Sequence, residues 1–199
     1  GLHLSLFVNG ISAGDKVVVP AMTHVATAHA VEYCGAEPIF VDVEQDSGNI
    51  DPTLFKQTLS DDVEAIMVVH YLGLPCEMDQ IIESAKKYRA IVIEDCALAL
   101  DATYDNKKVG THGLAGCFSF YPVKHMTTLE GGMLTTNDDG LAQRIRKSRA
   151  FGYDRSLGER PKPGVYDVDM LGYNYRMNEV EAAIGLVQLS KLDSFQQRR

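Results

Sequence analysis

The sequence lacks three features that would have pointed to particular classes of protein. No apolar run approaches the roughly 18 residues of a membrane-spanning helix. Basic charge is in the minority, with 19 Lys and Arg against 27 Asp and Glu and a net charge of −8, which disfavours nucleic acid as a partner. No G-x-G-x-x-G motif follows a strand-like run, so a nucleotide-binding dehydrogenase is disfavoured too.

Cysteine is scarce, and its spacing excludes the common metal and redox motifs. The four cysteines stand at positions 34, 76, 96 and 117 and form no C-x-x-C pair. Each lies in an apolar or strand-like stretch, which suits buried, reduced thiols in a cytoplasmic protein. Residues 1–11 already have a helical pattern, and residues 180–199 end in or just after another helix. We therefore expect residues 1–199 to be a piece of a longer protein.

Short apolar runs alternate with helical patterns along the chain, and 45% of the residues are hydrophobic. The runs predict strands over 16–20, 37–43, 65–70, 90–93, 116–121 and 132–135. The periodicity predicts helices over 2–9, 25–33, 51–59, 78–88, 138–148 and 178–192. Continuous apolar strands separated by helices indicate an α/β fold, with a mostly parallel sheet covered by helices on both faces. Such sheets bind ligands outside the carboxyl ends of their strands.

Two of the expected strands are followed by polar residues that could serve a ligand. His24 follows the first strand among small residues, and it is either a solvent-exposed residue at a helix start or a flat ring offered to a flat ligand. Glu94 and Asp95 end a buried strand. They are either one solvated acid and one helix N-cap, or they include a carboxylate kept ionised by a buried cation.

A third strand end holds a hydroxyl and an amine. Ser119 precedes Lys124 by five residues, and the pair Gly131 and Gly132 follows, which allows close backbone approach to a ligand. Lys124 is either an exposed lysine, as most lysines are, or a nucleophile that forms an imine with an aldehyde. Ring, acid, hydroxyl and amine together match the needs of pyridoxal phosphate (PLP). The long irregular segment 151–172 is a further candidate for a functional loop.

Two specific blocks carry a resemblance to a known family. These are SFYPVK…EGG over residues 119–132 and NYRM…AAIGL over residues 174–186, with further similarity in VIEDCALAL and along nearly the whole chain. The sequence resembles the DegT/DnrJ/EryC1/StrS family of PLP-dependent sugar aminotransferases. The resemblance implies the three-layer large domain of a fold-type-I PLP transferase. It also implies that residues 1–199 are this PLP-binding domain, truncated at its N-terminus and without the small C-terminal domain.

The resemblance also implies a role for each candidate residue. Lys124 would form the imine with the cofactor and shuttle the proton, and Asp95 would pair with the pyridine nitrogen. Ser119 would contact the phosphate, and His24 falls where the family has an aromatic ring that stacks on the cofactor. Asn174 would reach the phosphate of the partner subunit's site, so the active unit would be a homodimer.

This sequence departs from the family pattern in three respects. Leu98 stands where members often have a polar residue, commonly Gln or His, near the ring hydroxyl of the cofactor. The glycine-threonine phosphate loop that normally precedes the first helix is absent from the sequence, and so is the small C-terminal domain. The departure at Leu98 puts the fine tuning of the cofactor in doubt, while its binding is still expected.

The function implied is amino transfer from glutamate to a nucleotide-linked keto sugar, giving an amino sugar for a surface polysaccharide or a glycosylated metabolite. Two alternatives stay open. A sugar dehydratase of the same family would have histidine in place of the lysine, whereas here Lys124 is intact and His125 is one position away. A regulatory paralogue would keep the fold without turnover, and only Leu98 favours it.

Overall fold

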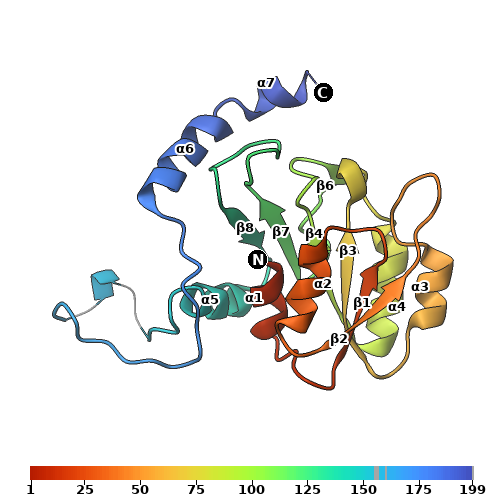
Figure 1. Ribbon diagram of the computed structural model, residues 1–199, viewed down its shortest axis with the longest axis horizontal. Helices are drawn as coiled ribbons and strands as arrows, with labels where there is room; N and C mark the ends of the chain where they lie inside the picture. Colours follow the sequence, from red (N-terminus) through yellow and green to blue (C-terminus); the bar gives the residue numbers. More distant parts are fainter. Residues whose placement is uncertain (155–156, 160, 199) are drawn as a thin grey trace.

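The structure is a computed structural model that describes residues 1–154, 157–159 and 161–198. Its centre is a six-stranded sheet with the order β2-β1-β3-β4-β7-β8 (Figure 1). The first five strands in that order are parallel, and β8 runs antiparallel to β7. The strands are β1 (Lys16–Pro20), β2 (Glu37–Val41), β3 (Val63–Val69), β4 (Ile91–Asp95), β7 (Ala115–Ser119) and β8 (Gly132–Thr135).

Helices cover both faces of this sheet, as predicted. The helices are α1 (Leu2–Phe7), α2 (Val25–Glu32), α3 (Pro52–Thr58), α4 (Met78–Tyr88), α5 (Asp139–Ser148), α6 (Glu179–Leu189) and α7 (Leu192–Gln196). Short 3₁₀ turns lie at η1 (Tyr71–Gly73) and η2 (Leu157–Glu159). No helix in the described ranges is long and apolar enough to cross a membrane.

The alternation of side chains along the strands divides the core into two layers. Val17, Val19 and Ile93 pack with residues of α1, α2 and α5. Val18 and Val92 point to the opposite face and pack with residues of α3 and α4. Successive residues of a strand point to opposite faces, so every residue of β4 belongs to one layer or the other.

Local sequence explains where several elements begin and end. Asp51 caps α3 by accepting hydrogen bonds from the backbone N–H of Thr53 and Leu54 at 2.7 and 3.0 Å, and Pro52 occupies the first helical position. The structure confirms the helix at 78–88 and the strands at 16–20 and 132–135 with the predicted bounds, and it moves most other predicted ends by one or two residues.

Two regions differ from the prediction. The predicted helix over 178–192 is two helices, α6 and α7, which extend beyond the sheet in Figure 1 and contain no fully buried residue. A hairpin of β5 (Thr103–Tyr104) and β6 (Lys107–Lys108) was not predicted. It turns through Asp105 and Asn106, which both have positive φ, as a two-residue hairpin turn requires.

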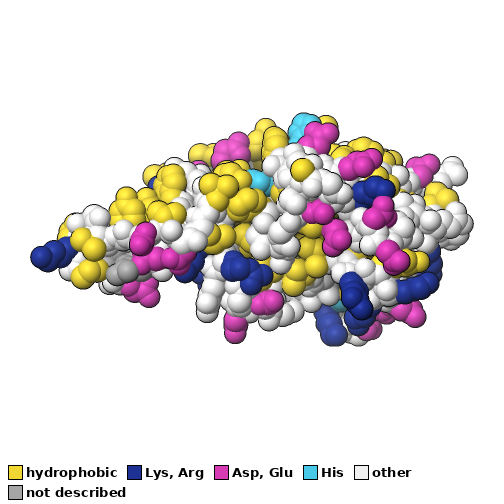
Figure 2. All heavy atoms as spheres, turned by 90° about the horizontal axis from the view of Figure 1, so that it is seen from below, with side chains coloured by type: hydrophobic (Ala, Val, Ile, Leu, Met, Phe, Trp, Pro, Cys, Tyr) yellow, Lys and Arg dark blue, Asp and Glu magenta, His cyan; other side chains and the backbone are white. Residues whose placement is uncertain are grey.

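The described part of the segment 151–172 is largely irregular, as predicted, and the segment is closed at its base. Tyr153 faces Val168 in an antiparallel bridge, and Asp169 N–H donates to the carbonyl of Gly152 at 2.9 Å. Part of the segment lies outside the described residues. Exposed hydrophobic side chains of the segment include Val165 and Leu171. Acidic and basic side chains are interspersed over the face drawn in Figure 2.

Candidate active site

Asp95 occupies the carboxyl end of β4 and is only 5% exposed. Its position in the strand points it to the layer of α2. There the hydroxyl of Thr27, on α2, donates to Asp95 Oδ2 at 2.8 Å, and Ala97 N–H donates to Oδ1 at 3.0 Å. A second hydroxyl, on Thr23, lies 2.8 Å from the Thr27 hydroxyl. The carboxylate is therefore fixed by two neutral donors.

No cation pairs with Asp95 within the described part of the chain. An ionised carboxylate is costly to bury unless its charge is compensated. Two neutral donors leave further lone pairs of Asp95 for another group. These residues therefore fit a ligand that brings its own positive charge, such as a protonated ring nitrogen.

The reading of Glu94 and Asp95 as a solvated acid and a helix cap is wrong. Glu94 is fully buried and Asp95 nearly so, because the strand carries both acids inside before the chain turns. The residues directly after Asp95 form a turn and no α-helix begins there.

Ser119 lies at the carboxyl end of β7, on the strand next to Asp95. The two strands pair Asp95 with Cys117, two residues before Ser119, so Ser119 points to the same side of the sheet as Cys117. Ser119 is partly exposed, and Tyr121 N–H approaches its hydroxyl at 3.4 Å. A partly exposed hydroxyl at a strand end is able to donate to a phosphate.

Lys124 lies in the loop that leaves β7, in a turn closed by its own N–H and the carbonyl of Tyr121 at 3.0 Å. The loop is held to its base by Thr128 N–H and the Thr127 hydroxyl, which donate to the carbonyl of Phe120 at 2.9 and 3.0 Å. Lys124 is half-buried, and it is not the fully exposed lysine of the alternative reading. It lines an open hollow of about 430 Å³.

The two sequence blocks that carry the family resemblance meet at this loop. α6 comes so close to it that a Cβ on Gly185 would lie 2.9 Å from a methyl carbon of Thr128. Gln188 of α6 accepts a hydrogen bond from Thr127 N–H at 3.4 Å and lines the hollow beside Lys124. The small residue at position 185 is thus required by the contact between α6 and the lysine loop.

His24 caps the start of α2, and its Nδ1 accepts a hydrogen bond from Ala26 N–H at 3.2 Å. The residue is exposed, which agrees with its reading as a helix-start histidine. It stands three residues before Thr27, at the end of α2 nearest to the Asp95 carboxylate. Stacking of its ring on a cofactor stays a prediction.

Asn174 makes its contacts with other residues of the chain. It faces Ala150 in an isolated antiparallel bridge, and its Oδ1 accepts a hydrogen bond from Arg176 Nε at 3.0 Å. Within the described ranges it makes no hydrogen bond to His24, Asp95, Ser119 or Lys124. Asn174 is exposed, and a role in another subunit's site stays a prediction. Leu98 follows Asp95 by three residues and is partly buried.

Thr27 is the polar contact of this site that sequence reasoning missed. It is fully buried on α2, within a run of small residues, and it is 68 positions from the aspartate that it contacts. A buried threonine in a helix is usually tied to the backbone of its own helix. The only indication in the sequence that Thr27 belongs to the site is its hydroxyl three residues after the helix-start histidine, and that indication is weak.

Comparison with known proteins identifies the family of the chain. The model of the DegT/DnrJ/EryC1/StrS aminotransferase family matches residues 1–199. The chain belongs to this family. The family membership accounts for the SFYPVK…EGG and NYRM…AAIGL blocks and for the fold, which is the large domain of a fold-type-I PLP transferase.

Three relatives show how far the similarity extends. A GDP-perosamine synthase from Caulobacter vibrioides is 44% identical over 96% of this chain and 50% of its own length. An aminotransferase from Psychrobacter cryohalolentis is 38% identical, with a TM-score of 0.91 over 97% of this chain and 50% of its own. A Streptococcus pneumoniae protein described as a sugar aminotransferase, solved in its PLP-form, is 28% identical, with a TM-score of 0.88 over 97% and 53%. The chain spans about half the length of these relatives.

Proposed function

We propose that this chain is the PLP-binding part of an aminotransferase that converts a nucleotide-linked keto sugar to an amino sugar, with glutamate as the amino donor. The observation that carries the proposal is the buried Asp95 carboxylate, which has two neutral donors and no cation among the described residues. Family membership and the similarity to a GDP-perosamine synthase and to a protein described as a sugar aminotransferase support it.

PLP, when bound, supplies an aldehyde that accepts the amino group of the donor and passes it to the ketone of the sugar. In the proposal Asp95 receives the pyridine nitrogen. A carboxylate in a nearly dry position keeps an adjacent ring nitrogen protonated, because the ion pair is poorly screened there. The hydrogen bond from Thr27 fixes the orientation of the Asp95 carboxylate, which would therefore approach the ring nitrogen from one direction.

Lys124 is proposed as the group that links to the cofactor aldehyde and moves the proton between donor, cofactor and sugar. Hydrogen bonds to the carbonyl of Phe120 fix the backbone of its loop. The Lys124 side chain is half-buried and lines the hollow, so there is space for the amine to change position. Ser119 would donate its hydroxyl to the phosphate, and His24 would lie against the ring.

The active unit is proposed to be a cytoplasmic homodimer in which Asn174 completes the partner's site. The exposure of Asn174 supports this arrangement. All four cysteines are free thiols, which suits a reducing compartment.

The test is amino transfer by the full-length protein. Purified enzyme with PLP and glutamate is given a GDP-linked or a UDP-linked keto sugar, and the products are analysed by mass spectrometry. Formation of the amino sugar together with an equal amount of 2-oxoglutarate is expected, and Lys124→Ala should abolish it. Lys107→Ala, an exposed lysine in the hairpin, is the matched control and should keep full activity.

The same assay separates the alternatives. Loss of a hydroxyl from the sugar without nitrogen transfer would show the dehydratase. Binding of PLP with no conversion of glutamate or of either sugar would show a regulatory paralogue.

A further inference from the structure

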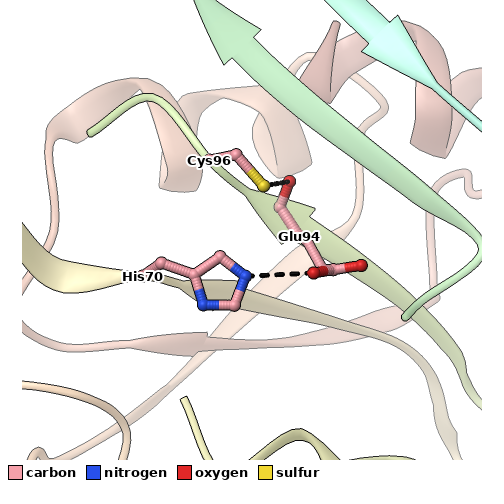
Figure 3. Close-up of side chains that lie close together, drawn as sticks. All are labelled: His70, Glu94 and Cys96. Carbon is pink, nitrogen blue, oxygen red and sulfur yellow. Dashed lines mark hydrogen bonds and ion pairs between the residues drawn. The ribbon is translucent and has the colours of Figure 1, made fainter. Parts of the chain in front are cut away.

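Glu94 precedes Asp95 on β4, and its side chain points to the opposite face of the sheet. There it lies in a fully buried group with His70 and Cys96 (Figure 3). Its carboxylate accepts four hydrogen bonds, and every donor is an N–H group. His70 Nε2 and Gly110 N–H reach Oε2 at 3.0 and 2.7 Å. The N–H groups of His112 and Gly113 reach Oε1 at 2.8 and 2.7 Å.

The hydrogen-bond pattern fixes the proton on His70. Cys76 N–H donates to His70 Nδ1 at 3.1 Å, so the ring proton is on Nε2 and points to Glu94. Cys96 turns its thiol toward the backbone carbonyl of Glu94 at 3.7 Å. His70 and Glu94 therefore have their ligand atoms engaged with protein partners. This group is an anchored carboxylate, although its residue types are those of a metal site.

Glycine residues allow the segment 110–113 to come close to Glu94. A Cβ on Gly113 would lie 2.5 Å from the carbonyl oxygen of Val92, and one on Gly116 would lie 2.2 Å from Cα of Gly110. The hydroxyl of Thr135, at the end of β8, donates to the carbonyl of Gly110 at 2.7 Å. Glu94 thus ties β4 to a segment that is itself tied to β8.

The same group is joined to the backbone of Asp95. His70 donates its side-chain N–H to Glu94 and its backbone N–H to the carbonyl of Asp95 at 3.2 Å. On the other side, Cys96 N–H donates to the carbonyl of Cys117 on β7 at 2.8 Å. The backbone on both sides of Asp95 is thereby hydrogen-bonded to the residues that follow β3 and to β7, while the Glu94 side chain is anchored on the face of the sheet opposite to the candidate cofactor site.

We propose that Glu94 is a positioning residue of the cofactor site, whose carboxylate, gripped by four N–H donors, fixes the backbone that presents Asp95 to the pyridine nitrogen. This inference rests on the proposed binding of PLP at Asp95. Glu94 would act through the backbone of Asp95, because its side chain is buried on the opposite face of the sheet and does not have to contact the cofactor.

The four hydrogen bonds to Glu94 require an ionised carboxylate as well as a side chain of this size. Burial alone raises the pKa of the Glu94 carboxyl, but hydrogen bonds from His70, Gly113 and Gly110 outweigh that effect, and the net pKa lies below its usual value. A glutamine at this position would turn an NH₂ group toward two N–H donors, because each carboxylate oxygen accepts from two of them. Glu94→Gln is therefore a small change in volume that breaks the anchor.

The test measures binding of PLP and of deaza-PLP, in which carbon replaces the pyridine nitrogen, to the full-length apoprotein. The wild type should bind PLP about tenfold or more tightly than the analogue, the ratio that a hydrogen bond to a charged group gives. In Glu94→Gln this preference should fall to about one, because Asp95 is no longer aimed at the nitrogen. The exposed control Glu37→Gln should keep the wild-type ratio.

The outcomes separate the inference from the function on which it rests. A wild type that binds both compounds equally, or neither, would overturn the PLP site itself. A wild-type preference that persists in Glu94→Gln would overturn the positioning role alone, even if that variant bound both compounds more weakly. Should Glu94→Gln fail to fold, His70→Phe removes one of the four donors, and the preference should fall about threefold; an unchanged preference there would also overturn the role.

Discussion

Thr27→Val tests whether the buried threonine of α2 holds the Asp95 carboxylate. The substitution keeps the shape of the side chain and removes the hydroxyl that donates to Asp95 at 2.8 Å. A hydrogen bond to a charged group contributes about 1.5–3 kcal/mol to stability. The added methyl group of valine returns up to about 0.8 kcal/mol through burial. We therefore expect the free energy of unfolding to fall by about 1–2 kcal/mol.

The assay is urea unfolding of the full-length apoprotein, followed by far-UV circular dichroism. With a slope m of about 3 kcal/mol/M, the expected loss lowers the midpoint by about 0.3–0.7 M urea while m stays unchanged. Thr53→Val is the matched control, since Thr53 is an exposed residue in the first turn of α3, and it should change stability by less than about 0.5 kcal/mol. Equal midpoints for the two variants would refute the role given to Thr27.

Three further predictions follow from the packing and the buried groups. Gly116→Ala should destabilise the protein by about 3 kcal/mol or more, because its Cβ would lie 2.2 Å from Cα of Gly110, whereas Gly158→Ala, which meets nothing within 4 Å, should melt at the wild-type temperature. The lowered pKa of Glu94 adds stability that is complete above the unfolded value of about 4.3 and is lost as the pH falls through the folded value. Unfolding midpoints measured between pH 6 and 3 (roughly, the range that spans this titration) should therefore fall less steeply in Glu94→Gln, and an unchanged slope would contradict the ionised anchor. Burial raises the pKa of the Cys76 and Cys117 thiols to about 12, so iodoacetamide at neutral pH should label them only after unfolding, and rapid labelling of the native protein would contradict their burial.

The positions of the strands along the chain could be predicted because the local pattern and the global fold agree. KVVVP over residues 16–20 is a continuous β-branched run, and the structure buries it between two neighbouring strands. The rule that ligands bind at the carboxyl ends of parallel strands pointed to Asp95, Ser119 and Lys124, and the structure places all three at or just after such ends. Their chemical roles stay predictions.

The partners of the two acids could not be predicted, because they come from distant parts of the chain. Thr27 reaches Asp95 across 68 positions, and Gly113 reaches Glu94 across 19. Nothing in the local pattern separates an acid that faces the helix α2 from one that faces a backbone segment. That distinction depends on the phase of β4, which the register of the sheet fixes.

The break between α6 and α7 was missed for a similar reason. Residues 178–192 contain no proline and many good helix formers, such as Glu, Ala, Leu and Gln, so propensity favours one continuous helix. Gln196 of α7 donates to the carbonyl of Leu100 at 2.8 Å, a tertiary contact that accompanies the change of direction.

Chemical trapping tests directly whether the Lys124 amine forms the covalent link to PLP. The full-length protein is incubated with PLP, reduced with borohydride to make any link between lysine and cofactor permanent, digested and mapped by mass spectrometry. We expect one labelled peptide, containing Lys124, and no label in that peptide when glutamate is added before reduction. A label on another lysine, or none on the wild type, would contradict this expectation.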